Sequence, residues 1–118
     1  ILNEVTGFPY FDKVGENKVV VMKPPERYIN HSCGPNTYVK NWKYISIRDI
    51  KKGEEITADY AINNDYTPER LKCSCGSKNC RRIFPGMFFN LSKTTQRKYL
   101  PYLETWFKRK HKEKLRKL

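Results

Sequence analysis

Long hydrophobic runs are missing from this sequence, whose uninterrupted apolar stretches reach only about four residues, as in Val19–Met22. A transmembrane helix needs roughly 20 apolar residues, so a role across a membrane is excluded and no membrane partner is expected. A charged segment followed by an apolar one is also missing after Ile1, so no secretory signal peptide is expected. Internal repeats and low-complexity linkers are absent as well.

Acidic residues are scarce: 12 Asp and Glu stand against 24 Lys and Arg, which gives a net charge of +12 and a pI of about 9.7. The aromatic fraction of 14% is too high for a disordered basic tail, so the 118 residues predict one domain with a packed core. Residues 92–118 hold +8 of the net charge, with ten Lys and Arg against Glu104 and Glu113. Such a cluster attracts polyanions or acidic partners, or it is a solvated helix end that serves only solubility.

Short strands separated by turns are predicted for the first half of the sequence. Residues 42–47 alternate between two sets of side chains, which indicates a strand with two different faces. Residues 49–54 are predicted as a turn with Gly53 at positive φ. Further strand candidates are residues 18–22, 37–39 and 55–60.

A helix is predicted after Ser92, because this serine can cap it and apolar residues then recur three or four positions apart. Pro101 lies inside the apolar stripe and should kink or split the helix. The predicted fold class is therefore mainly β with short irregular strands, followed by a cysteine-bearing loop over residues 73–80 and one C-terminal helix.

The four cysteines are unevenly spaced, with Cys73, Cys75 and Cys80 close together and Cys33 placed 40 residues before the first of them. Cysteines separated by one residue rarely form a disulfide, because that bond needs Cβ atoms about 3.8 Å apart and turned toward each other. The same spacing suits two corners of a tetrahedral thiolate site for Zn²⁺. With no export signal, the pattern predicts an intracellular protein that holds one zinc ion through all four thiolates. Two disulfides or unrelated buried thiols are the alternatives.

Three segments occur in a characteristic order: residues 27–36 (RYINHSCGPN), residues 53–60 (GEEITADY), and the cysteine loop that ends in Cys80-Arg81. Together they resemble the C-terminal half of a SET-domain protein lysine methyltransferase with its post-SET zinc loop. The resemblance covers about residues 18–84. It implies a SET-like β fold with a knot-like arrangement, in which the chain around Tyr60 threads the segment 27–36.

The resemblance implies two cofactors, Zn²⁺ and S-adenosyl-L-methionine. In this family the cysteine of the Asn-His-Ser-Cys string is the fourth zinc ligand, so Cys33 is expected to join the three cysteines of the loop. Asn30 and His31 match the residues that hold S-adenosylmethionine through side-chain and main-chain hydrogen bonds. Arg27 matches an arginine of the same segment that is structural or faces the cofactor.

The resemblance also implies a catalytic residue, since Tyr60 matches the catalytic tyrosine of the family. Residues just after the last cysteine, here Ile83 or Phe84, cover the adenine or form one wall of the lysine channel in the family. The implied activity is S-adenosylmethionine-dependent N-methylation of a protein lysine, in the cytoplasm or in the nucleus or nucleoid.

Three departures from the family pattern bear on these expectations. The Gly-x-Gly loop of the family's N-terminal half is missing, since Gly7 and Gly15 are eight residues apart, so residues 1–118 alone are expected to bind S-adenosylmethionine weakly or not at all. Ala58 stands where a Phe or Tyr usually helps to set the number of methyl groups, which leaves mono-, di- or trimethylation open. Arg82 replaces a glycine often found after Cys-Arg, which puts the usual backbone path near the adenine in question.

These patterns divide the chain into a partial SET domain (residues 1–72), a post-SET zinc loop (residues 73–86) and a basic amphipathic C-terminal helix (residues 87–118). The leading interpretation is a protein-lysine N-methyltransferase or its C-terminal catalytic part. The alternative is a catalytically incomplete zinc-binding SET remnant that binds proteins or nucleic acid. A dedicated nucleic-acid-binding zinc module is disfavoured, because the basic residues gather on the terminal helix and not among stacking aromatics.

Overall fold

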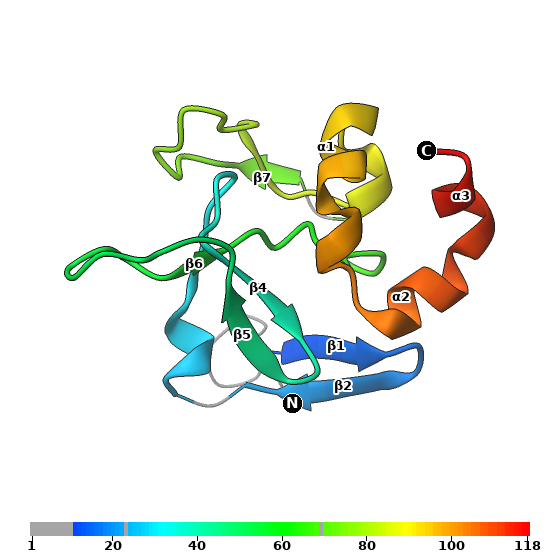
Figure 1. Cartoon of the computed structure of the whole chain (residues 1–118), viewed down its shortest axis with the longest axis horizontal. Helices are drawn as coiled ribbons and strands as arrows, with labels where there is room; N and C mark the ends of the chain where they lie inside the picture. Colours follow the sequence, from blue (N-terminus) through cyan, green and yellow to red (C-terminus); the bar gives the residue numbers. More distant parts are fainter. Residues whose placement is uncertain (1–10, 23, 69) are drawn as a thin grey trace.

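The computed structural model describes residues 11–22, 24–68 and 70–118, which form three small sheets and a group of short helices (Figure 1). Strands β1 (Phe11–Gly15) and β2 (Lys18–Val21) form an antiparallel hairpin. The four-stranded sheet has the order β3 (Asn30–His31), β6 (Thr57–Ala58), β4 (Thr37–Lys40) and β5 (Lys43–Ser46). The third sheet is the hairpin of β7 (Arg70–Lys72) and β8 (Ile83–Pro85). The prediction of a mainly β fold with short strands is confirmed.

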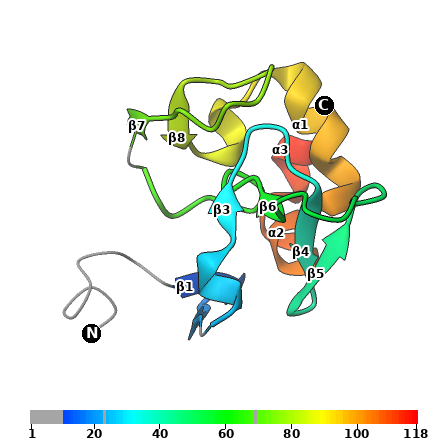
Figure 2. The same cartoon turned by 90° about the vertical axis from the view of Figure 1, so that its left-hand side faces the viewer.

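Strand β6 lies between β3 and β4 and runs parallel to both, although β3 and β4 are close neighbours in sequence (Figure 2). Ala58 is the register partner of His31 on one side and of Thr37 on the other. The backbone N–H of Ser32 donates to the Ala58 carbonyl at 3.0 Å, which adds a further bond between the segments. The segment joining β3 to β4 therefore passes around β6, in agreement with the threaded arrangement expected near Tyr60.

Among the residues whose burial the structure describes, the hydrophobic core is built mainly by the C-terminal part of the chain. Its buried side chains are Ala61, Phe88, Leu91, Tyr99, Leu103 and Phe107. Of these six, Ala61 alone comes from the segment that carries the SET-like motifs. The rings of Phe88 and Phe107 meet edge to face with their centroids 5.3 Å apart, a geometry that aromatic pairs prefer. The C-terminal region is therefore part of the core and not an appendage to it.

The predicted C-terminal helix is divided into short pieces, namely η2 (Phe88–Asn90), α1 (Lys93–Tyr99), η3 (Leu100–Tyr102), α2 (Thr105–Lys110) and α3 (Lys112–Arg116). Ser92 caps α1 as predicted, because its hydroxyl accepts the backbone N–H of Thr95 at 3.2 Å. Pro101 stands in η3, where the predicted split occurs, since its ring prevents an α-helix from continuing. A second break at His111 separates α2 from α3 and was not predicted from the sequence.

A buried ion cluster around Asp65 ties the last two helices to the first hairpin. Lys13 of β1 lies 2.9 Å from Asp65 Oδ1, and Lys110 and His111 lie 3.0 and 2.7 Å from Oδ2. Burial raises the pKa of Asp65, but hydrogen bonds from His111, Lys13 and Lys110 outweigh it and lower the pKa to about 2. The carboxylate therefore stays ionised and joins β1, α2 and the segment after Tyr60.

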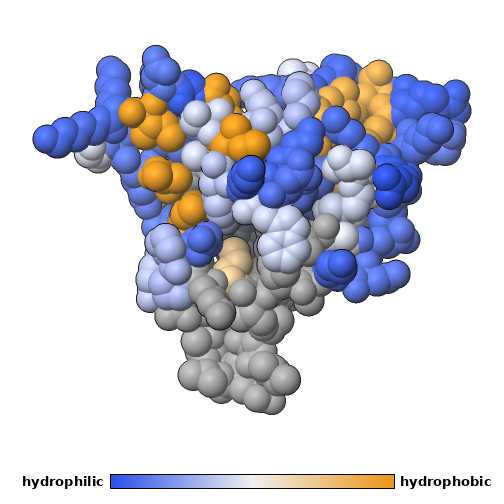
Figure 3. Space-filling model, turned by 60° about the horizontal axis from the view of Figure 1, so that its bottom comes forward, coloured by the Kyte–Doolittle hydropathy of each residue, from blue (hydrophilic) through white to orange (hydrophobic). Residues whose placement is uncertain are grey.

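Exposed apolar side chains of the described residues come from several parts of the chain. On the face shown in Figure 3, small hydrophobic groups are separated by hydrophilic side chains. The large exposed ones are Tyr28, Trp42, Ile45, Ile56 and Leu71, of which Trp42 and Ile45 belong to one hairpin. Isolated exposure of this kind is ordinary for a protein surface. Within the described ranges, every helix is too short or too polar to reach across a bilayer.

Candidate metal centre and active site

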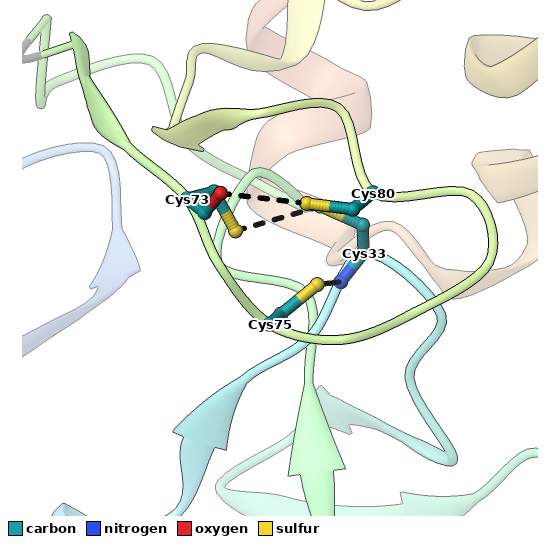
Figure 4. Close-up of side chains that lie close together, drawn as sticks. All are labelled: Cys33, Cys73, Cys75 and Cys80. Atoms are coloured by element: carbon teal, nitrogen blue, oxygen red, sulfur yellow. Dashed lines mark hydrogen bonds between the residues drawn. The ribbon is translucent and has the colours of Figure 1, made fainter.

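The four cysteines predicted as metal ligands point toward one another (Figure 4). Cys33 follows β3, whereas the other three lie between β7 and β8. The four Sγ atoms lie within 4.8 Å of one another, and those of Cys33 and Cys73 are 3.9 Å apart. Tetrahedral Zn–S bonds of about 2.3 Å place the sulfur atoms roughly 3.8 Å apart, so the spacing fits a zinc ion. All four cysteines are free of disulfide bonds, so the two-disulfide alternative does not hold.

Backbone N–H groups are directed at the sulfur atoms. Arg81 donates to Cys33 Sγ, Cys33 to Cys75 Sγ, and Arg82 to Cys80 Sγ, each at 3.4 Å. Burial raises the pKa of Cys33 to about 12, whereas for Cys75 backbone N–H groups overcome the effect of burial and lower the pKa to about 6. A cation is needed to ionise the buried thiols together, and Zn²⁺ is the ion that a closed set of four thiolates favours.

Three rings from three segments meet beside this cluster. The ring centroid of Tyr60 lies 5.5 Å from that of His31 and 5.5 Å from that of Phe84, and the His31 and Phe84 centroids are 5.1 Å apart. His31 is two residues from Cys33, so the rings and the candidate metal centre are adjacent. The fold therefore brings together residues that the sequence motifs assigned to catalysis, cofactor binding and metal binding.

The imidazole of His31 links the candidate metal centre to Tyr60. Its Nδ1 accepts the backbone N–H of Tyr60 at 3.1 Å, which assigns the ring proton to Nε2, 3.4 Å from Cys33 Sγ. Burial lowers the pKa of His31, and the positive charge of Arg81 lowers it further, whereas the negative charge of Asp59 raises it. The net effect is a lowered pKa, so the ring is neutral at pH 7. Both ring nitrogens of His31 are therefore engaged within the protein.

The hydroxyl of Tyr60 donates to the carbonyl of Ile29, directly before β3. This bond fixes the orientation of the phenol across the threaded segments. A hydroxyl oxygen retains acceptor capacity when its proton is donated, so the phenol oxygen can accept a hydrogen bond from an amine.

The other two residues predicted for cofactor binding lie near the start of the same segment. Asn30 is exposed, and its Nδ2 donates to Glu55 Oε2 at 2.7 Å. The backbone of Arg27 belongs to η1 (Glu26–Tyr28), and its side chain lies outside what the structure describes. Their cofactor roles stay predictions.

A buried carboxylate lies directly before Tyr60, inside the GEEITADY string. The Asp59 side chain is fully buried and accepts two hydrogen bonds from the Arg81 guanidinium, at 2.7 and 2.8 Å. Tyr99 donates its hydroxyl to Oδ2 at 2.7 Å, and the backbone N–H of Ala61 donates to Oδ1 at 3.0 Å. The position of Asp59 inside the GEEITADY string was the one available signal for this cluster.

Arg82, which replaces the glycine often found after Cys-Arg, has a φ of +65°. This left-handed conformation is one that glycine adopts readily and that costs other residues about 1–2 kcal/mol. The backbone here therefore keeps a conformation suited to the usual glycine, although the residue has changed.

Comparison with known proteins agrees with this geometry. The SET domain family matches residues 4–61, a range that includes the Asn30–Cys33 string and ends directly after Tyr60. The chain belongs to the SET-domain family and carries, after the match, a cysteine loop whose sulfur atoms converge on Cys33.

Three similar proteins are all named as histone-lysine N-methyltransferases. The trithorax protein of Drosophila virilis is 40% identical over 84 residues, which cover 62% of this chain and 2% of the relative. The human histone-lysine N-methyltransferase 2D is 46% identical over 66 residues, which cover 49% of this chain and 1% of the relative. The H3 lysine-36 specific histone-lysine N-methyltransferase of Debaryomyces hansenii is 44% identical over 68 residues, which cover 51% of this chain and 9% of the relative. The chain thus matches between 1% and 9% of the length of these relatives.

Proposed function

We propose that this chain carries the catalytic site of an S-adenosylmethionine-dependent protein-lysine N-methyltransferase. The observation that supports the proposal is the meeting of Tyr60, His31 and Phe84 beside four convergent thiols, in a chain of the SET-domain family. The relatives are named for histone lysines, so a lysine of a histone or of another basic protein is the proposed methyl acceptor.

The chemistry requires a neutral amine, which the site is suited to provide. The reference pKa of lysine is about 10.4, so near pH 7.4 about one lysine in a thousand is neutral. Deprotonation of the amine at this pH therefore costs roughly 4 kcal/mol. A low-dielectric channel lowers the pKa of an amine that enters it. The rings of Tyr60 and Phe84 provide apolar walls for the lysine stem, and the Tyr60 oxygen accepts a hydrogen bond from the amine. Since methyl transfer is an in-line displacement, orientation of the amine is the main task of these residues.

Asn30, the main chain of His31, Phe84 and Arg27 are the residues proposed to hold S-adenosylmethionine. When bound, that cofactor supplies an electrophilic methyl group on a positively charged sulfur. The engagement of the His31 ring by Cys33 and Tyr60 supports a main-chain role for His31.

Zinc has a structural role in this proposal. The four cysteines would hold it between the segment after β3 and the β7–β8 loop, and this link would keep Phe84 against His31 and Tyr60. A set of four reduced thiols is maintained inside cells, so the proposed place of action is the cytoplasm or the nucleus or nucleoid.

Replacing Tyr60 with phenylalanine is expected to lower kcat about 100-fold, because the group that orients the amine is lost while the ring remains. The measurement is transfer of labelled methyl groups to purified histones and to total cell protein. Tyr38→Phe, in β4, is the matched control and should retain full activity. Equal methyl transfer by Tyr60→Phe and the parent would show that Tyr60 has been misassigned. A parent without any methyl transfer would favour the non-catalytic alternative.

We also propose that exposed basic residues of α2 and α3, with Lys117 directly after α3, contact an acidic surface or nucleic acid near the substrate. Lys108, Arg109, Lys112 and Lys117 are exposed, and within the described ranges they form no ion pair. Binding to duplex DNA is expected to weaken steeply as the salt concentration rises. Changing Lys108 and Lys112 to glutamine should reduce the slope of the logarithm of the binding constant against the logarithm of the salt concentration, by about one for each phosphate that is no longer neutralised. Changing Lys51 and Lys52 in the Gly53 turn is the matched control. A slope that does not change in the helix variant would argue against nucleic acid as the partner.

A further inference from the structure

Helix α1 reaches the proposed catalytic segment through one buried side chain. Tyr99, the last residue of α1, is 2% exposed, and its hydroxyl donates to Asp59 Oδ2 at 2.7 Å. These two residues are 40 positions apart in the chain. Asp59 directly precedes Tyr60, so the C-terminal helices contact the segment on which catalysis is proposed to depend.

The peptide groups on both sides of Tyr60 are held by side chains. The N–H of Tyr60 donates to His31 Nδ1 at 3.1 Å, and the N–H of Ala61 donates to Asp59 Oδ1 at 3.0 Å. The orientation of the Asp59 carboxylate therefore determines one of the two hydrogen bonds that fix this turn.

Two donors from different parts of the chain set that orientation. Arg81, directly after the last cysteine, contacts both carboxylate oxygens, and Tyr99 contacts Oδ2 from the side of the helices. Burial and the charge of Asp59 raise the pKa of Tyr99, so its hydroxyl remains a proton donor throughout the neutral range. Hydrogen bonds to a buried carboxylate are among the strong ones in proteins, and they restrict its rotation.

We propose that Tyr99 is a positioning residue for methyl transfer: its hydroxyl orients the Asp59 carboxylate, which holds the Ala61 N–H and thereby the turn that carries Tyr60. The inference rests on the function proposed above for Tyr60. Tyr99 lies beyond the cysteine loop and outside the range matched by the SET domain family, so the role follows from the contacts alone.

The test is a double-mutant cycle in the natural protein, because residues 1–118 alone are expected to bind S-adenosylmethionine weakly or not at all. Tyr99→Phe keeps the ring and removes the donor, and it should lower kcat about tenfold while the KM values of both substrates change less than twofold. Tyr102→Phe is the matched control, because Tyr102 lies three residues away with its ring against Tyr38 and should keep full kcat. In a Tyr60→Phe background, Tyr99→Phe should cause no further loss, since residues that act as one unit are non-additive. Replacing Tyr99 with p-aminophenylalanine, which restores a donor, should recover most of the lost rate.

Two results would overturn the inference. One is a Tyr99→Phe chain that melts earlier but keeps its kcat well below the melting temperature, and the other is an additive loss in the Tyr60→Phe background. A parent chain without any methyl transfer contradicts the proposed function and not the inference about Tyr99. In that case NMR of chains labelled with ¹³C-tyrosine tests whether Tyr99 positions the turn that carries Tyr60. Tyr99→Phe should shift the ring signals of Tyr60 and Tyr102→Phe should not, whereas unchanged Tyr60 signals in Tyr99→Phe would overturn the inference.

Discussion

A chain with Cys73 replaced by serine is expected to lose its zinc and the ordered structure of the loop between β7 and β8. Cys73 is 4% exposed, and its Sγ lies 3.9 Å from that of Cys33. Structural zinc contributes roughly 10 kcal/mol or more of apparent binding free energy to folding. This is comparable with the whole stability of a typical domain, about 5–15 kcal/mol. Loss of one ligand should therefore unfold the loop and release the segment that carries Cys33 and His31.

Metal analysis and circular dichroism measure this effect. The parent chain should hold one zinc per chain and the Cys73→Ser chain almost none, with a melting transition that is strongly lowered or absent. Ser74→Ala changes the exposed neighbouring residue and should leave zinc content and melting unchanged. A Cys73→Ser chain that keeps its zinc and its melting temperature would contradict the four-thiolate centre.

Replacing Asp59 with alanine is expected to lower the free energy of unfolding by about 3–5 kcal/mol, the usual effect of removing one partner from a buried ion pair. The substitution removes both acceptors of the Arg81 guanidinium and the acceptor of the Tyr99 hydroxyl. The Arg81 side chain is only 22% exposed, so water cannot fully replace the carboxylate. The variant is therefore expected to unfold at a much lower urea concentration.

Urea unfolding followed by fluorescence gives the size of this change. Asp49→Ala, at an exposed acid in a turn, is the control and should change the free energy of unfolding by less than about 0.5 kcal/mol. Asp59→Asn preserves the shape and removes the charge, so it separates the ionic part of the effect from the packing part. A loss below about 1 kcal/mol in Asp59→Ala would show that the cluster does not stabilise the fold.

Features that depend on neighbouring residues could be predicted from the sequence. Ser92 caps α1, Pro101 ends it, and Gly53 has a φ of +84°, each for a reason that lies within a few positions. The convergence of Cys33 on the other cysteines was predicted from the number and spacing of the cysteines, and the family resemblance strengthened this prediction for a residue that is 40 positions away.

The Asp59 cluster could not be predicted, since its partners Arg81 and Tyr99 are 22 and 40 residues away and no spacing rule connects them. The break at His111 was also hidden, because an apolar stripe does not show where tertiary contacts divide a helix. Here His111 binds Asp65 and packs its ring on Phe107, with centroids 4.5 Å apart. Long-range contacts of this kind override local helix preference.

The origin of the core determines when the chain can fold during translation. In the part of the chain that the structure describes, most core side chains, from Phe88 to Phe107, are synthesised after the strands and all four cysteines. A ribosome that adds about 5–20 residues per second therefore completes the strands and the cysteine loop seconds before the side chains of this core exist. Translation that stops before Phe107 should yield chains for chaperones and proteases to bind, and not a smaller working domain.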